Sequence, residues 1–143
     1  MEELENKEEV KIDFSELEKE GFIKQRQEGL FFVRVKSNSG MLNPEQLTRI
    51  AELTKLYGEG SAHLTVRQEI EVPGIRHENI NLFREGLVTS GLSVSKGGFS
   101  VKAVVSCPGV KWCARSWVDS VAVAETIDKE FYGKEQFAKL ANK

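Results

Sequence analysis

A helix with explicit start and stop signals, set between two strand-like segments, constrains the fold of this chain most strongly. Asn43 is a favourable N-cap, Pro44 suits the first helical position, and Gln46 completes a capping box. A glycine directly after the helical pattern provides the stop signal. Because residues 30–36 and 62–72 on either side show β-type patterning, we expect a strand–helix–strand unit with a right-handed crossover.

Both strand-like segments sort their side chains onto two faces. LFFVRVK (residues 30–36) is rich in aromatic and β-branched residues, as strands are. In AHLTVRQEIEV (residues 62–72) apolar and polar residues alternate, as in a strand with one buried face. Gln68 interrupts the second apolar face, and a Pro-Gly pair closes that strand. The predicted inward-facing residues are Phe31, Val33 and Val35, then Ala62, Leu64, Val66, Ile70 and Val72. The helix is expected to turn Leu47, Ile50, Ala51, Thr54 and Tyr57 inward.

Shorter signals organise the rest of the chain. A capping box of Ser15 and Glu18 predicts a short first helix. Further elements are expected at residues 77–88 (helix), 99–106 (strand) and 114–132 (helix, with Trp112 and Trp117 packing it against the sheet). The fold class is therefore α+β, an α/β sandwich. A break near Gly97-Gly98 suggests three parts: an acidic N-terminal segment (1–21), a first unit (22–96) and the start of a second (97–143).

Composition excludes several classes of protein. The 143 residues, 40% of them hydrophobic, fit one packed domain and argue against disorder. A net charge of −2 gives no reason to expect a nucleic-acid surface, and no apolar run reaches membrane-spanning length. The acidic N-terminus lacks the order of a signal peptide. We therefore expect a soluble, cytoplasmic protein, in which the two cysteines are ligands or free thiols rather than a disulfide.

The two cysteines lie in the stretch VVSCPGVKWCARS. Cys107 is expected at the end of a strand and Cys113 at the start of a helix, with Pro108-Gly109 turning the chain between them. A helix N-terminus favours thiolate and suits an anionic iron–sulfur cluster. The spacing matches neither a zinc site nor a C-x-x-C redox pair. On spacing alone, two unrelated cysteines are the favoured interpretation.

Three basic residues are candidates for an anion-binding site. Arg34 and Lys36 share one face of a predicted strand, and Arg67 lies on a face of another, so the three cations converge if the strands are neighbours. Convergent cations suit carboxylates or a small oxyanion. The alternative is a solvated face on which Glu69 and Glu71 neutralise Arg67, and that alternative is favoured without further information.

Three segments in order resemble a known family. GFIKQRQEGLFFVRVKSNSGMLNPEQLTRIAEL, AHLTVRQEIEVPGI and VVSCPGVKWCARSWVDSVAVA together resemble the siroheme-dependent nitrite and sulfite reductases, above all the short, dissimilatory-type sulfite reductase-like proteins. The resemblance covers most of the chain from residue 21 to about residue 133. T-x-R-Q at residues 65–68 is moderately specific alone, and C-P-G-x-x-x-C after it makes the combination strong.

The resemblance implies a role for each motif. Residues 22–96 would be the ferredoxin-like half domain, and residues 97–143 the start of the domain that holds siroheme and a 4Fe–4S cluster. Arg34 and Arg67 would face the siroheme and the bound anion as the catalytic cations. Cofactor-binding residues in the same motifs would be Lys36, Thr65 and Gln68, with Lys36 and Gln68 helping to hold siroheme carboxylates. Cys107 and Cys113 would be the first two ligands of the cluster.

The sequence departs from the family at one point. The family completes the cluster with a second pair of cysteines, and this sequence contains only two cysteines. We therefore expect a chain cut before the second pair, unmetallated and inactive in isolation. The intact protein would reduce sulfite or nitrite with electrons from a donor protein or domain. A single half domain also favours a homodimer. The alternatives are a non-catalytic module that binds a tetrapyrrole or a partner subunit, and a scaffold with two free thiols.

Overall fold

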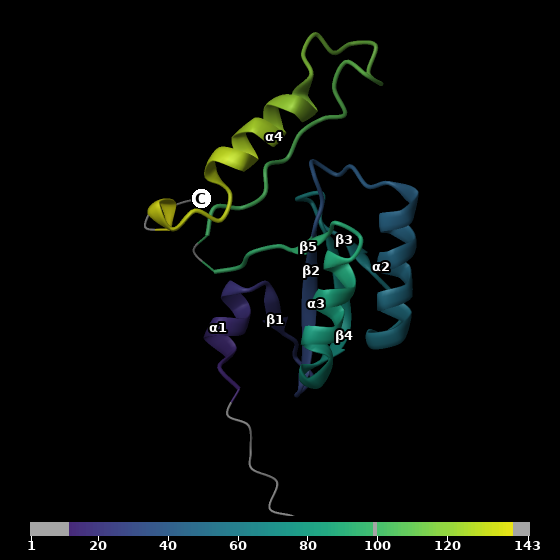
Figure 1. Ribbon diagram of the computed structural model, residues 1–143, viewed down its shortest axis with the longest axis vertical. Helices are drawn as coiled ribbons and strands as arrows, with labels where there is room; N and C mark the ends of the chain where they lie inside the picture. Colours follow the sequence, from purple (N-terminus) through teal and green to yellow (C-terminus); the bar gives the residue numbers. More distant parts are fainter. Residues whose placement is uncertain (1–11, 99, 139–143) are drawn as a thin grey trace, which may run out of the picture.

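A computed structural model describes residues 12–98 and 100–138, so the acidic start of the chain, Phe99 and the last five residues lie outside the described residues. Its elements follow in the order shown in Figure 1: α1 (Phe14–Lys19), β1 (Phe22–Lys24), β2 (Leu30–Lys36), α2 (Pro44–Tyr57), β3 (His63–Leu64), β4 (Ile70–Arg76), η1 (His77–Asn79), α3 (Ile80–Val88), β5 (Ser93–Val94), α4 (Ser120–Phe131) and η2 (Glu135–Phe137). The expected α+β class is confirmed.

The sheet has the strand order β1-β2-β4-β3, and β5 pairs with β2. Every pairing is antiparallel, and the register sets Arg34 opposite Glu71. β2 and β3 both run antiparallel to β4, so they are parallel to each other and flank it. The strands joined by α2 are therefore not neighbours, unlike the adjacent pair that a simple strand–helix–strand unit suggests.

The core lies between the sheet and the helices α2 and α3, which cover one face of it (Figure 1). Phe31, Val33 and Val35 are at most 1% exposed, which confirms the predicted inner face of β2. The capping box of Asn43 and Gln46 is also confirmed. The predicted stripe of α2 is only partly right, since the helix buries Ile50, Leu53 and Thr54, while Leu47 and Ala51 are exposed.

The predicted strand of residues 62–72 is wrong as a single element. It divides into β3, which has two residues, a turn, and β4, which continues through Pro73-Gly74 to Arg76. The physical cause is a side chain that competes with the ladder: the Thr65 hydroxyl accepts hydrogen bonds from two main-chain N–H groups of the turn. Leu64 and Val66, expected in the core, are 76% and 96% exposed.

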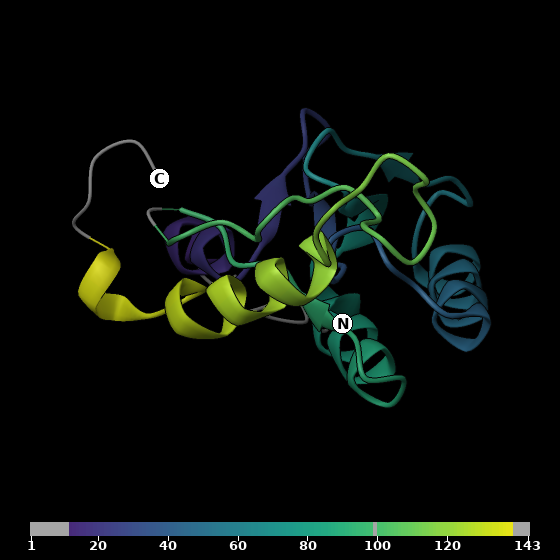
Figure 2. The ribbon, with the colours of Figure 1, turned by 90° about the horizontal axis from the view of Figure 1, so that it is seen from above.

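The second part of the chain also differs from expectation. The structure has no regular strand between residues 100 and 119, and α4 begins at Ser120 because Asp119 caps it by accepting from the N–H of Ala122. The tryptophans do not pack α4 against the sheet, since Trp112 and Trp117 are 57% and 96% exposed. The first helix is capped by Asp13, not by Ser15. Figure 2 shows α4 and the extended segment before it lying side by side.

Candidate functional site

The turn between β3 and β4 presents Arg67 to solvent. Its main chain closes through Gln68 N–H and the Thr65 carbonyl at 3.0 Å, and the Thr65 hydroxyl accepts from the N–H groups of Arg67 and Glu69 at 3.3 and 3.2 Å. Gln68 adopts a positive φ of 61°. Arg67 is exposed, and in the part of the chain that the structure describes its guanidinium has no hydrogen-bonding partner. Thr65 therefore shapes the turn, and Arg67 is free to bind a ligand.

Arg34 is tied to acidic residues of the neighbouring strand. Its Nε donates to Glu71 Oε1 at 2.9 Å and its Nη2 donates to the same oxygen, while Glu69 Oε2 lies 3.9 Å from Nε. Glu69 is only 2% exposed, and its carboxylate also accepts from the Ser95 hydroxyl. The two carboxylates thus neutralise Arg34, whereas the sequence suggested that they neutralise Arg67.

The pKa of the Glu71 carboxyl reflects the charged groups around it. Burial raises the pKa of its carboxyl, but the hydrogen bonds and charges of Arg34 and His63 outweigh burial and hold the pKa below its ordinary value of 4.5. His63 Nδ1 lies 3.2 Å from Glu71 Oε2. Glu71 is therefore a stable anion at neutral pH, and it competes with any other anion for Arg34.

Lys36 is engaged by α4. Its Nζ lies 2.5 Å from Asp128 Oδ2 and 4.4 Å from the centre of the Tyr132 ring. Both charged side chains are less than one-fifth exposed. Lys36 therefore fastens α4 to the sheet. Arg34, Lys36 and Arg67, which would converge if their strands were neighbours, have three different environments.

Gln68 joins the Arg67 turn to the cysteine segment. Its Nε2 donates to the Ser106 carbonyl at 2.7 Å, and its Oε1 accepts from the Ser106 N–H at 3.2 Å. Ser106 directly precedes Cys107, so the two motifs that the sequence singled out are in contact. A hollow of about 510 Å³ borders this junction, lined by Leu64, Thr65, Gln68, Ser106, Pro108 and residues of the 39–42 turn among others.

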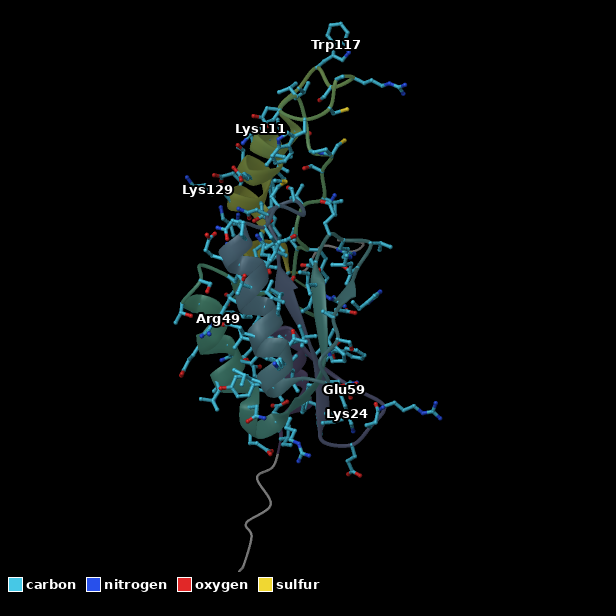
Figure 3. All side chains as sticks on the ribbon, turned by 90° about the vertical axis from the view of Figure 1, so that its right-hand side faces the viewer. Lys24, Arg49, Glu59, Lys111, Trp117 and Lys129 are labelled. Carbon is cyan, nitrogen blue, oxygen red and sulfur yellow. The ribbon has the colours of Figure 1, made fainter. Side chains whose placement is uncertain are left out.

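Both cysteines are free thiols on a compact loop. Cys107 is exposed, and its carbonyl accepts from the hydroxyl of Ser120, the first residue of α4, at 2.9 Å. Cys113 is half-buried in a turn, its N–H donating to the Gly109 carbonyl at 3.0 Å. The prediction that Cys113 begins a helix is wrong, and α4 begins beside the main chain of Cys107 instead. Figure 3 shows the loop tip carrying Trp117 far from the sheet.

Sequence reasoning found these residues but not their connections. The Gln68–Ser106 pair joins positions 38 apart, and no local pattern encodes it. The one available signal was Gln68 itself, a polar residue on an otherwise apolar face. Within residues 12–98 and 100–138, no three His, Cys, Asp or Glu side chains group as a metal site, and no helix is long and apolar enough to cross a membrane.

Comparisons with known proteins give the family of the first unit. Residues 23–88 match the model of the nitrite/sulfite reductase ferredoxin-like half domain. An uncharacterized protein of Methanocaldococcus jannaschii is 36% identical over 103 residues, covering 72% of this chain and 37% of that protein. The chloroplastic ferredoxin–nitrite reductase of Spinacia oleracea is 29% identical over 122 residues, covering 85% of this chain and 20% of the enzyme.

The fold is found in a solved structure as well. The NirA protein of Mycobacterium tuberculosis superposes with a TM-score of 0.80 at 22% identity, covering 90% of this chain and 28% of that one. This chain thus spans 37% or less of the length of these three proteins. The matches confirm the resemblance and the half-domain fold expected from the motifs. Residues 23–88 of this chain therefore form a nitrite/sulfite reductase ferredoxin-like half domain.

Proposed function

We propose that this chain is part of a siroheme- and 4Fe–4S-dependent oxidoreductase that reduces nitrite or sulfite with electrons from a donor protein or domain. The observation that carries the proposal is the Gln68–Ser106 pair, which sets the Arg67 turn against the segment that ends in Cys107. Residues 22–96 would supply the cations, and residues 97–143 would supply cysteines. A cofactor with both an anionic macrocycle and a thiolate-bound cluster would use both motifs.

The cysteine loop fits an iron–sulfur ligand pair. Both thiols are unpaired and at least partly accessible, and Lys111 and Arg115 on the same loop bring positive charge to an anionic cluster. Cys107 and Cys113 would supply two thiolates, and the other two would have to come from outside the given sequence, which has no further cysteine. When bound, the cluster would relay electrons from the donor and the siroheme would supply the iron that binds the anion.

Arg67 is the cation best placed for the anion. Its free, planar guanidinium can donate two parallel hydrogen bonds to a carboxylate or to a small oxyanion and stabilise charge that develops there. Arginine is too basic to donate a proton, so a lysine or water has to do so. Arg34 has to share its charge with Glu71, and Lys36 with Asp128. We therefore expect both to contribute less to anion binding than Arg67.

Anaerobic titration of the purified chain with siroheme, followed by visible absorption, tests the proposal. We expect saturable binding, weakened about tenfold or more by Arg67→Ala, because a hydrogen-bonded charge is lost. Arg26→Ala is the matched control, since Arg26 is also an exposed arginine in a turn, the one between β1 and β2. Binding that is absent, or equal in Arg67→Ala and the control, would contradict the proposal.

A non-catalytic module that binds a partner subunit is the second candidate. The observation in its favour is an apolar stripe along α4, in which Val123, Ile127 and Phe131 are 42–48% exposed. Sedimentation velocity of the chain separates the candidates, with Ile127→Glu as the test variant. Self-association that Ile127→Glu abolishes, in a chain that does not bind siroheme, would favour this second function and would be consistent with a homodimer.

A further inference from the structure

Both the nitrogen and the oxygen of the Gln68 side-chain amide form hydrogen bonds to the main chain of one residue, Ser106. Nε2 donates to the Ser106 carbonyl at 2.7 Å and Oε1 accepts from the Ser106 N–H at 3.2 Å. The orientation of the amide is unambiguous, because a main-chain N–H can only donate and a carbonyl can only accept. The side-chain amide thus donates one hydrogen bond to the main chain of Ser106 and accepts one from it, as a neighbouring strand would in a sheet.

Gln68 is itself held on several sides. Its carbonyl accepts from the Ser37 hydroxyl, and its N–H donates to the Thr65 carbonyl at 3.0 Å. Its positive φ of 61° is a conformation that non-glycine residues adopt rarely and at a cost in free energy. Gly40 leaves room for its side chain, since a Cβ there would lie 3.3 Å from Gln68 Cβ. The surroundings thus determine where the amide points.

Few side chains from other described elements bind the main chain of the segment that Gln68 contacts. No strand pairing holds residues 100–108, and the described side chains that bind the main chain there from other elements are Gln68, Asp128 and Ser120. Asp128 reaches the Val104 N–H only at 3.5 Å, and Ser120 binds the Cys107 carbonyl at 2.9 Å. Gln68 is the attachment to the sheet domain that lies nearest to Cys107.

We propose that Gln68 is a positioning residue, which fixes Cys107 relative to the turn that carries Arg67, and not a ligand of siroheme carboxylates. Arg67 and Gln68 are adjacent, so the same turn carries the proposed anion-binding cation and clamps the cysteine segment. The clamp itself follows from the contacts, whereas its use in holding a cluster thiolate rests on the proposed function. Both polar atoms of the Gln68 amide already bind the Ser106 main chain. Binding a carboxylate instead would cost these hydrogen bonds.

Hydrogen exchange of the Ser106 amide, measured by NMR in the full chain, tests the clamp. We expect Gln68→Ala to speed exchange of this amide by about tenfold, because its acceptor is lost. Gln25→Ala is the matched control. Gln25 is buried where Gln68 is half-buried, and its Oε1 likewise accepts from a main-chain N–H, that of Gly74, at 2.7 Å, but it lies in the β1–β2 turn. The control should lower global stability similarly without a selective effect at Ser106.

A spin label on Cys107 in a Cys113→Ser background reports the position of the thiol. Its EPR line shape should narrow in Gln68→Ala and remain unchanged in Gln25→Ala. Gln68→Glu provides a second variant if Gln68→Ala does not fold: it keeps an acceptor for the Ser106 N–H but loses the donor to the carbonyl, so intermediate mobility is expected.

Two results would overturn the assignment. The first is equal Ser106 exchange and equal label mobility in Gln68→Ala and the parent chain. The second is weaker siroheme binding in Gln68→Ala together with unchanged exchange, which is the signature of a direct ligand. A chain that binds no siroheme but loses Ser106 protection in Gln68→Ala would refute the proposed function and leave the clamp intact, so the two failures are distinguishable.

Discussion

Replacing Arg34 with methionine tests the charge cluster beside the candidate site. Methionine preserves much of the aliphatic stem and removes the only cation that binds both Glu69 and Glu71 in the described residues. Those carboxylates are 3% and 15% exposed at the side chain, so neither can regain full hydration in the folded state. We therefore expect the variant to be clearly less stable than the parent chain at neutral pH.

The size of the loss follows from burial. Breaking a buried ion pair by removing one partner costs about 3–5 kcal/mol. Arg34 is 24% exposed, so solvent screens part of the attraction, and we expect a loss of about 2–3 kcal/mol. Arg84→Met is the matched control, because the Arg84–Glu20 pair is 38% and 43% exposed. That variant should lose less than about 1 kcal/mol.

The pH dependence provides an independent check. Glu71 has a lowered pKa in the folded chain, so its stabilising contribution is present above the ordinary value of 4.5 and is lost as pH falls through the lowered value. Without Arg34, mainly His63 is left to offset the rise in the Glu71 pKa that burial causes. The Glu71 carboxyl therefore accepts a proton more readily. The stability gap between parent and variant should therefore be smaller at pH 4 than at pH 7.

Urea unfolding followed by far-UV circular dichroism measures these differences. Tryptophan fluorescence is unsuitable, because both tryptophans are already largely exposed in the folded chain. An unfolding free energy for Arg34→Met within about 0.5 kcal/mol of the parent at pH 7 would refute the reasoning. A gap that stays constant between pH 7 and pH 4 would show that the lost stability comes from packing and not from charge.

Three further substitutions probe other features. Lys36→Met should increase hydrogen exchange across α4, because it removes the ion pair to Asp128 that fastens this helix to the sheet; unchanged exchange would contradict that role. Gly21→Ala should destabilise the chain by more than about 2 kcal/mol in urea unfolding, because the glycine has a φ of 92° and a Cβ would lie 1.9 Å from the Ser95 carbonyl oxygen. Trp117→Ser should change the unfolding free energy by less than about 0.5 kcal/mol, since the side chain is 96% exposed, and a larger loss would mean that the ring packs in solution.

Local signals predicted the first unit well. The capping box at Asn43, the inner face of β2 and the helix after residue 76 all depend on neighbours within a few residues, and all three are present. Errors arose where a side chain competed with the expected main-chain pairing. Thr65 turned a predicted strand into a turn, and Asp119 set the start of α4 beyond the predicted position. The partners of Arg34 and Lys36 lie 37 and 92 residues away, beyond the reach of any periodic pattern.

The turn at residues 65–68 explains why the candidate site differs from the one inferred from alternation. In an unbroken strand, Arg67 would share a face with Glu69 and Glu71 and would be neutralised by them. Because Gln68 adopts a positive φ, the chain reverses before Glu69, and both carboxylates are left on the face of Arg34. One local conformation thus leaves Arg67 free for an anion, pairs Arg34 with acids, and aims the Gln68 amide at Ser106. A substitution that abolishes this turn should therefore impair siroheme binding and the protection of Ser106 together, whereas Arg67→Ala should impair only the first.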